Sequence, residues 1–138
     1  MGNLCKKSLM SMDIDGLGDF SFEGLECNVR VSSIYDGDTG RIVFMYKGDL
    51  IQYKFRLYGI DAPELKPRLD KENREIEKKN AIISRDYLKN MVMNKLLWCK
   101  FYKFDKYGRI LVDLYLKKGG ILVNKRMLED KMAVEYKM

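Results

Sequence analysis

An arginine, an aspartate and a glutamate lie within nine residues of one another in the segment Phe55–Glu64, FRLYGIDAPE. Side chains of a strand alternate between its two faces, and a proline ends the hydrogen bonding of a strand. Arg56, Asp61 and Glu64 can therefore converge where a strand runs into the turn at Pro63. A guanidinium matches a phosphate through paired hydrogen bonds, and carboxylates are the oxygen ligands that Ca²⁺ or Mg²⁺ needs. The segment thus carries groups able to bind a phosphate and a divalent cation.

Two other segments add charged groups of the same kinds. Upstream, a tight turn over residues 36–39, DGDT, offers Asp38, and downstream residues 105–109, DKYGR, offer a lysine, a tyrosine and a second arginine. Asp38, Asp61 and Glu64 at one site would all be ionised near neutral pH and would repel one another without a cation. Hard carboxylate oxygens favour Ca²⁺, Mg²⁺ or Mn²⁺ over zinc. The three acids therefore predict a divalent-metal site.

Cleavage of a phosphodiester bond places further demands on these residues. Negative charge builds on the phosphate oxygens while water attacks in line, so a site needs cations beside the phosphate and a group that orients the water. Arg56 and Arg109 fit the first role, and Glu64 fits the second as a general base or a water-positioning residue. Each motif also has an ordinary explanation, because DGDT and DAPE are rich in turn-forming residues and single arginines mostly face solvent.

The composition narrows the classes of enzyme and partner. The chain has no histidine, which removes the usual general base of many nucleases and the usual zinc ligand. Cys5, Cys27 and Cys99 are odd in number and far apart, which favours reduced thiols over a zinc site or a disulfide framework. Residues 1–28 carry a net charge of −3, so residues 29–138 carry +9. Such a basic body favours a polyanionic partner, either nucleic acid or an acidic membrane surface.

The hydrophobic pattern predicts one domain, since 138 residues with 46% apolar content suffice for a sizeable core. Alternating apolar residues predict strands, the first three of them an antiparallel meander. One amphipathic helix is expected to pack on the core through Ile76, Ile83, Tyr87 and Met91, with Leu88 and Val92 beside them. The expected strands are 29–34, 42–46, 50–57, 96–104 and 110–116, and the expected helices are about 75–95 and about 123–130.

The first 22 residues differ from the rest of the chain. They are polar, acidic and dotted with glycine, with no sustained period, which predicts a flexible arm (1–22) before a domain of residues 23–138. No apolar run approaches a transmembrane segment, and the N-terminus lacks the hydrophobic core of a signal peptide, so we expect an intracellular protein. Gly2 followed by Cys5 matches acylation signals poorly, because Lys6 stands where the myristoylation pattern has Ser or Thr.

The order of the motifs carries a family resemblance. YDGDT, FRLYGIDAPE, DKYGR and LVNKRML follow one another at spacings that closely resemble the staphylococcal nuclease (thermonuclease) family, from about Val29 to the C-terminus. The resemblance implies a mostly β chain with helices (α+β), a five-stranded β-barrel of the oligonucleotide-binding (OB) fold with packed helices. It also implies a Ca²⁺-dependent endonuclease of low sequence specificity. The strands flanking Lys47 and Gly48 are each about two residues longer than is usual in the family, and this even addition leaves the face of Arg56 unchanged.

The resemblance also implies roles for single residues and for partners. Asp38 and Asp61 resemble direct metal ligands, and Ala62, where the family often has threonine, would contribute its backbone carbonyl. Lys106 and Tyr107 match positions that contact a terminal phosphate of the bound nucleotide. A lysine charge beside a tyrosine ring suits single strands, so we expect action on DNA and RNA with a preference for single-stranded substrates. We also expect a monomer. The alternative is a non-catalytic nucleic-acid- or protein-binding module, as occurs where family copies have lost these acids or arginines.

Overall fold

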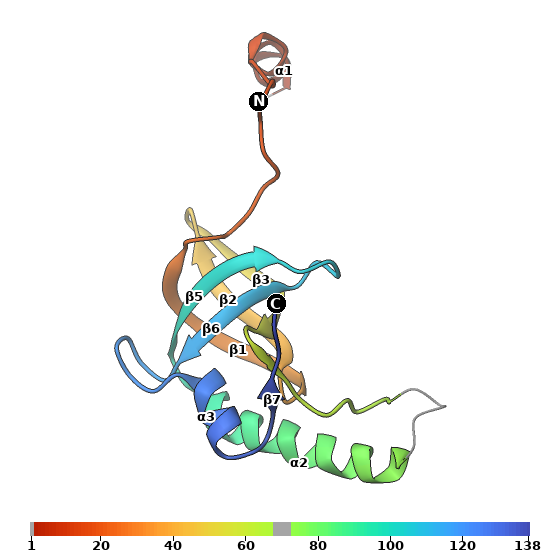
Figure 1. The fold of residues 1–138 in the computed structure, drawn as a ribbon. Helices are drawn as coiled ribbons and strands as arrows, with labels where there is room; N and C mark the ends of the chain where they lie inside the picture. The colour runs from red at the N-terminus through yellow and green to blue at the C-terminus, as the bar shows by residue number, and fades with distance from the viewer. Residues whose placement is uncertain (1, 68–72) are drawn as a thin grey trace.

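Five strands close into a β-barrel, and helices lie outside it (Figure 1). The computed structural model describes residues 2–67 and 73–138. The barrel strands are β1 (Glu26–Asp36), β2 (Thr39–Tyr46), β3 (Asp49–Leu57), β5 (Leu97–Phe104) and β6 (Ile110–Tyr115). The helices are α1 (Gly2–Ser11), α2 (Arg74–Val92) and α3 (Val123–Glu129), and a small second sheet pairs β4 (Ile60–Asp61) with β7 (Val134–Glu135).

The order of strands around the barrel is β1-β2-β3-β6-β5, and β5 pairs with β1 to close it. Neighbouring strands are antiparallel except for β3 and β6, which are parallel. The structure thus confirms the predicted antiparallel meander and the predicted five-stranded barrel of the OB type. Inward side chains of each strand are apolar and fill the interior, as small barrels require. They include Val29, Ile42, Phe55, Phe101 and Val112.

The pairing of β2 with β3 decides which residues face outward beside the predicted site. Its register is unbroken from the pair Thr39–Arg56 to the pair Tyr46–Asp49. Phe55 and Leu57 are fully buried, so the alternation of the strand places Arg56 on the outer face. Every second residue of β3 before Arg56 lies on that same outer face.

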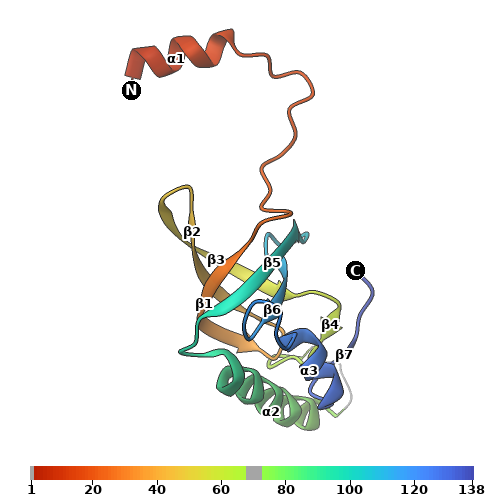
Figure 2. The same cartoon turned by 90° about the vertical axis from the view of Figure 1, so that its left-hand side faces the viewer.

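Helix α2 crosses one end of the barrel, and α3 lies beside it (Figures 1 and 2). Its buried face consists of Ala81, Ser84, Leu88 and Val92. The prediction that Ile76 and Ile83 pack on the core is wrong, because these side chains are 59% and 47% exposed, whereas Tyr87 and Met91 are partly buried against the core. The small side chains of Ala81 and Ser84 let α2 lie close to the barrel on this face. The bulkier side chains of Ile76 and Ile83 consequently point away from the barrel. In the described ranges, no helix is long and apolar enough to cross a membrane.

The N-terminal segment holds two features that its composition did not predict. Residues Gly2–Ser11 form α1, which lies away from the barrel at the end of an extended segment (Figure 2). Phe22, assigned above to the arm, is buried to 6% exposure. Its ring packs edge-on against Phe44 and Tyr46 at centroid distances of 5.3 and 5.1 Å. The packed domain therefore includes Phe22, one residue before the predicted boundary, and the alternation of Phe20 and Phe22 was too short to indicate this.

Substitution of Phe22 by alanine is expected to lower the free energy of unfolding by about 3–5 kcal/mol, because it removes a buried ring and leaves a cavity. Phe20 is the matched control: its ring touches Phe22, but its side chain is 60% exposed, so Phe20→Ala should cost much less. Urea denaturation of both variants measures the difference. Equal, small effects would place Phe22 in the arm after all.

Candidate active site

The turn between β1 and β2 is pressed against α2, which buries Asp38. A Cβ added to Gly37 would lie 1.9 Å from the Ser84 Oγ, so a side chain at this position would have to displace that hydroxyl. The hydroxyl is itself fixed, because it donates a hydrogen bond of 2.7 Å to the Met132 carbonyl. Glycine thus permits the close approach of turn and helix, and Asp38 is left only 4% exposed.

The buried carboxylate of Asp38 has few groups that compensate its charge. The Ala62 backbone N–H donates to its Oδ2 at 3.0 Å, and the Arg56 Nη2 lies 3.8 Å from the same oxygen. Burial raises the pKa of Asp38 to about 6, and Asp61 and Asp36 add to this effect, while the Ala62 hydrogen bond and Arg56 oppose it. A nearby cation would therefore stabilise the ionised form of Asp38.

Arg56 connects Asp38 with Asp61. Its Nη2 donates to the Ile60 carbonyl at 3.2 Å and to Asp61 Oδ1 at 3.3 Å. The Tyr136 ring covers the guanidinium, with its centroid 5.2 Å from the Arg56 Cζ. The Arg56 Nε is buried and has no hydrogen-bond acceptor among the described residues. A buried donor without a partner is costly, so an anionic oxygen brought by a ligand would be favoured beside it.

Only two of the three predicted acidic residues, Asp38 and Asp61, lie close together. Asp38 and Asp61 both lie against the Arg56 Nη2, but the described residues hold no group of three or more acidic or thiol side chains close enough to bind a metal ion. Glu64 is exposed, and its backbone N–H donates to Glu77 Oε1 at 3.2 Å. In this structure the Glu64 carboxylate therefore does not complete a cluster with the other two acids.

Asp38, Asp61 and the carbonyl of Ala62 are nevertheless chemically suited to a hard cation. Two carboxylates with water and substrate oxygens are a common ligand set for divalent ions that bind phosphate. A pocket of about 240 Å³ opens beside Asp61 and Ala62, so an ion and its waters could reach them. The raised pKa of Asp38 points the same way, since it marks a negative charge that the protein itself leaves poorly compensated.

The second arginine is held at the turn before β6. Arg109 Nε lies 2.6 Å from Asp105 Oδ2, and the backbone N–H groups of Tyr107 and Arg109 both donate to Asp105 Oδ1. Partial burial alone would raise the pKa of Asp105, but these hydrogen bonds and the Arg109 charge lower it. Tyr107 is 66% exposed, and the Lys106 Nζ and the Arg109 Cζ each lie 5.2 Å from the centroid of its ring.

Two residues of the site escaped the sequence analysis. Asp105 fixes Arg109, and its spacing of four residues from that arginine was a usable signal, typical of an Asp that closes a turn. Tyr136 covers Arg56 because its backbone N–H bonds to the Gly59 carbonyl at 2.9 Å, beside the pairing of β7 with β4. No local pattern links residues this far apart in the chain.

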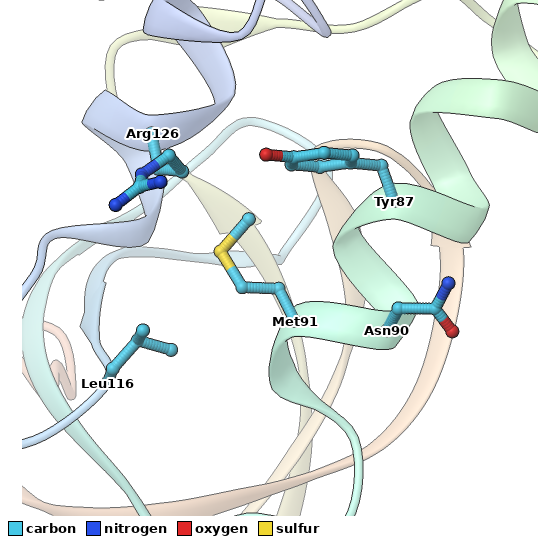
Figure 3. Close-up of a pocket in the computed structure, with 5 residues that line it drawn as sticks. All are labelled: Tyr87, Asn90, Met91, Leu116 and Arg126. Carbon is cyan, nitrogen blue, oxygen red and sulfur yellow. The ribbon is translucent and has the colours of Figure 1, made fainter.

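A larger apolar pocket lies elsewhere. It measures about 380 Å³ and opens between α2 and α3, where Tyr87 and Met91 project toward Arg126 (Figure 3). It is lined by Tyr87, Asn90, Met91, Leu116 and Arg126. None of the predicted site residues is among them, so the chemistry predicted above belongs to the Arg56 region and not to this pocket.

Several known proteins are similar in sequence to this chain. Residues 54–138 match the family model described as staphylococcal nuclease homologue, a range that holds every predicted site residue except Asp38. An uncharacterized endonuclease of Escherichia coli is 31% identical over 107 residues, which cover 78% of this chain and 60% of that protein. The probable staphylococcal-like nuclease CAN1 of Oryza sativa subsp. japonica is 35% identical over 85 residues, or 62% of this chain and 22% of that protein. The staphylococcal-like nuclease CAN1 of Arabidopsis thaliana is 34% identical with the same coverage.

Proposed function

This chain belongs to the staphylococcal nuclease family, and we propose that it is a Ca²⁺-dependent endonuclease that hydrolyses phosphodiester bonds of DNA and RNA with low sequence specificity. The observation that carries the proposal is the Arg56 guanidinium, which contacts both Asp38 and Asp61 and whose buried Nε finds no acceptor in residues 2–67 and 73–138. A phosphate oxygen would supply that acceptor. Because the chain spans about a fifth of the plant relatives and 60% of the bacterial one, the activity is proposed for this domain alone.

The two arginines bind the scissile phosphate. Arg56 is held by Asp61 on one side and by the Tyr136 ring on the other, so its guanidinium is fixed before the substrate arrives. Arg109 is fixed in the same way by Asp105. Donors that are already in position stabilise the charge developing on the phosphate oxygens without reorganising during the reaction.

Asp38, Asp61 and the backbone carbonyl of Ala62 hold the cation. When bound, Ca²⁺ supplies positive charge that polarises the phosphate and a coordinated water. Asp38 is buried and fixed by the Ala62 N–H, whereas the Asp61 side chain is 45% exposed, so Asp38 provides the rigid ligand and Asp61 the adaptable one. Calcium tolerates such an uneven ligand set because its coordination is flexible.

Glu64 orients the attacking water and accepts its proton. Its exposed carboxylate follows the turn at Pro63, one of the segments bordering the pocket beside Asp61. Catalytic contacts often tighten only when substrate is bound, so the exposed position of Glu64 is compatible with this role.

Lys106 and Tyr107 bind a neighbouring phosphate and favour single strands. Both lie at an exposed turn, where the Tyr107 ring can stack on an unpaired base. Such contacts read charge and ring surface instead of base identity, which accounts for low sequence specificity and for action on both DNA and RNA. The chain is proposed to act as a monomer.

Digestion assays test the proposal directly. The purified chain should cut single-stranded DNA and RNA in the presence of Ca²⁺, stop when a chelator is added, and recover when Ca²⁺ is restored in excess. Duplex DNA should be cut more slowly, because its bases are not free to stack. Binding of nucleic acid without cleavage in Ca²⁺, Mg²⁺ or Mn²⁺ would instead identify a non-catalytic binding module.

A further inference from the structure

A second group of cations lies on the outer face of the barrel next to Arg56. Arg41 of β2 pairs with Lys54 of β3, in the row adjacent to the pair Thr39–Arg56. Lys54 precedes Arg56 by two residues, so both side chains leave β3 on the same face, about 7 Å apart along the strand. Arg109 directly precedes β6, and the parallel pairing of β3 with β6 begins at Phe55 and Ile110, so continuing this register by one residue sets Arg109 next to Lys54. Arg41, Lys54 and Arg109 are called the cationic row below.

This arrangement is unfavourable in the free protein. Like charges directly opposite each other on neighbouring strands destabilise a sheet. Arg109 is neutralised by Asp105, but neither Arg41 nor Lys54 has a carboxylate within ion-pair distance among the described residues. The Arg41 Nε is moreover buried without an acceptor, which in the described ranges is true of one other side-chain atom, the Arg56 Nε.

Two members of the cationic row, Arg41 and Lys54, line a pocket. A hollow of about 360 Å³ lies over β2, β3 and the turn before β6. Its walls are Arg41, Gln52, Tyr53, Lys54, Tyr107 and Gly108. It therefore joins two unpaired cations to an exposed tyrosine ring and an amide side chain, which are groups that bind a phosphate and an unpaired base. Among the described residues, no carboxylate lines it.

We propose that this pocket is a further nucleotide subsite, in which Arg41 and Lys54 bind a backbone phosphate next to the one held at Arg56 and Tyr107 stacks on its base. The inference rests on the proposed function, since the ligand is the same DNA or RNA strand that is cut beside Arg56. Arg41 and Arg56 lie on successive pairs of one sheet face, and the Nε of each lacks an acceptor in the part of the chain that the structure describes, so their guanidinium groups are suited to bind consecutive phosphates of one strand. The pocket thus sets how long a strand must be to bind tightly.

The test compares long and short ligands. Arg41→Gln and Lys54→Gln are made in a Glu64→Gln background, so that the strand is not cut, and binding of a fluorescent single-stranded octanucleotide is measured with Ca²⁺ by anisotropy. Each substitution should weaken octanucleotide binding by about tenfold, the effect expected on losing one hydrogen-bonded charge contact. Each should also reduce the slope of log affinity against log salt by about 0.7. A labelled dinucleotide, with one phosphodiester group for the Arg56 site, should bind equally to all variants.

Lys79→Gln is the matched control, because it removes the same charge from an exposed position on α2, a helix that contributes no residue to the pocket. The variants should unfold at the same temperature as the parent or higher at low salt, since the like-charge pair is relieved, whereas a purely structural role would lower it. Octanucleotide binding unchanged in both variants, or dinucleotide binding reduced to the same extent, overturns the subsite. If the native protein with Glu64 binds the octanucleotide tightly and the dinucleotide weakly but never cuts nucleic acid, the proposed nuclease function is refuted and the subsite remains supported. If the Glu64→Gln parent does not bind the octanucleotide, both proposals are refuted.

Discussion

Substitution of Arg56 by alanine should lower kcat by about a thousandfold or more. Loss of one preorganised donor to a developing oxyanion typically costs about 10²–10³ in rate, and loss of an arginine from phosphoryl transfer about 10³–10⁵. Arg56 contacts both predicted metal ligands and retains a buried donor for the phosphate, so its removal affects binding of the transition state at several points. Single-turnover cleavage of single-stranded DNA with saturating Ca²⁺ measures the effect.

Alanine at this position also leaves Asp38 and Asp61 without their shared cation, so folding must be controlled. Arg56→Lys keeps a positive charge but not the planar fork that matches a phosphate, and it should remain folded while still losing most activity. Arg30→Ala removes an exposed arginine from β1 and should cut at the normal rate. Glu64→Gln and Arg109→Ala should also lower the rate by orders of magnitude, and near-normal cleavage by any two of the three variants, Arg56→Ala included, would end the catalytic assignment.

Replacement of Asp38 by asparagine should abolish Ca²⁺-dependent cleavage and yet stabilise the metal-free protein at neutral pH. Burial raises the pKa of Asp38 to about 6, whereas an unfolded chain has an aspartate pKa of about 3.9. Between these pH values the folded state binds more protons than the unfolded state. The free energy of unfolding of the native protein is therefore highest below about pH 4 as far as Asp38 is concerned, and it falls as the pH rises toward 6. Asparagine carries no such charge and its amide oxygen can still accept the Ala62 N–H. The free energy of unfolding at pH 7 should therefore rise by about 1–3 kcal/mol.

Calcium should make the native protein more stable than the Asp38→Asn variant, which reverses their order without metal. Binding of Ca²⁺ to the folded state stabilises the native chain by mass action, and the asparagine variant should lack that gain. Thermal unfolding across pH, with chelator and with Ca²⁺, measures both effects. Asp49, exposed at the tip of the β2–β3 hairpin, is the control, since Asp49→Asn should change neither. Equal Ca²⁺ affinity in the native and Asp38→Asn proteins would show that Asp38 only forms the turn.

Most of the barrel follows from local patterns. The alternation of apolar residues in β1, β2 and β3 and the turns between them specify an antiparallel meander, because side-chain direction in a strand repeats every two residues. The same rule put Arg56 on the outer face and, through the unbroken β2–β3 register, fixed its row. The face of α2 was harder to predict, because apolar residues lie around much of the helix, and only the close approach of Gly37 to Ser84 selects the face that is buried.

The sequence by itself determined which chemical groups this protein has. Without histidine, catalysis must use Glu, Asp, Lys, Arg, Tyr or Cys, and the order of the motifs predicted the family that the comparisons then found. Tertiary structure decided which of those groups meet. Asp38 and Asp61 come together on Arg56 and Tyr136 covers it, but Glu64 stays exposed. The alignment of Arg41 and Lys54 beside Arg56 follows from the register of the β2–β3 hairpin, whereas the burial of Asp38, with the raised pKa that follows, depends on packing between segments distant in sequence. Local patterns cannot encode such distances, because they arise only when the strands pair and the barrel closes.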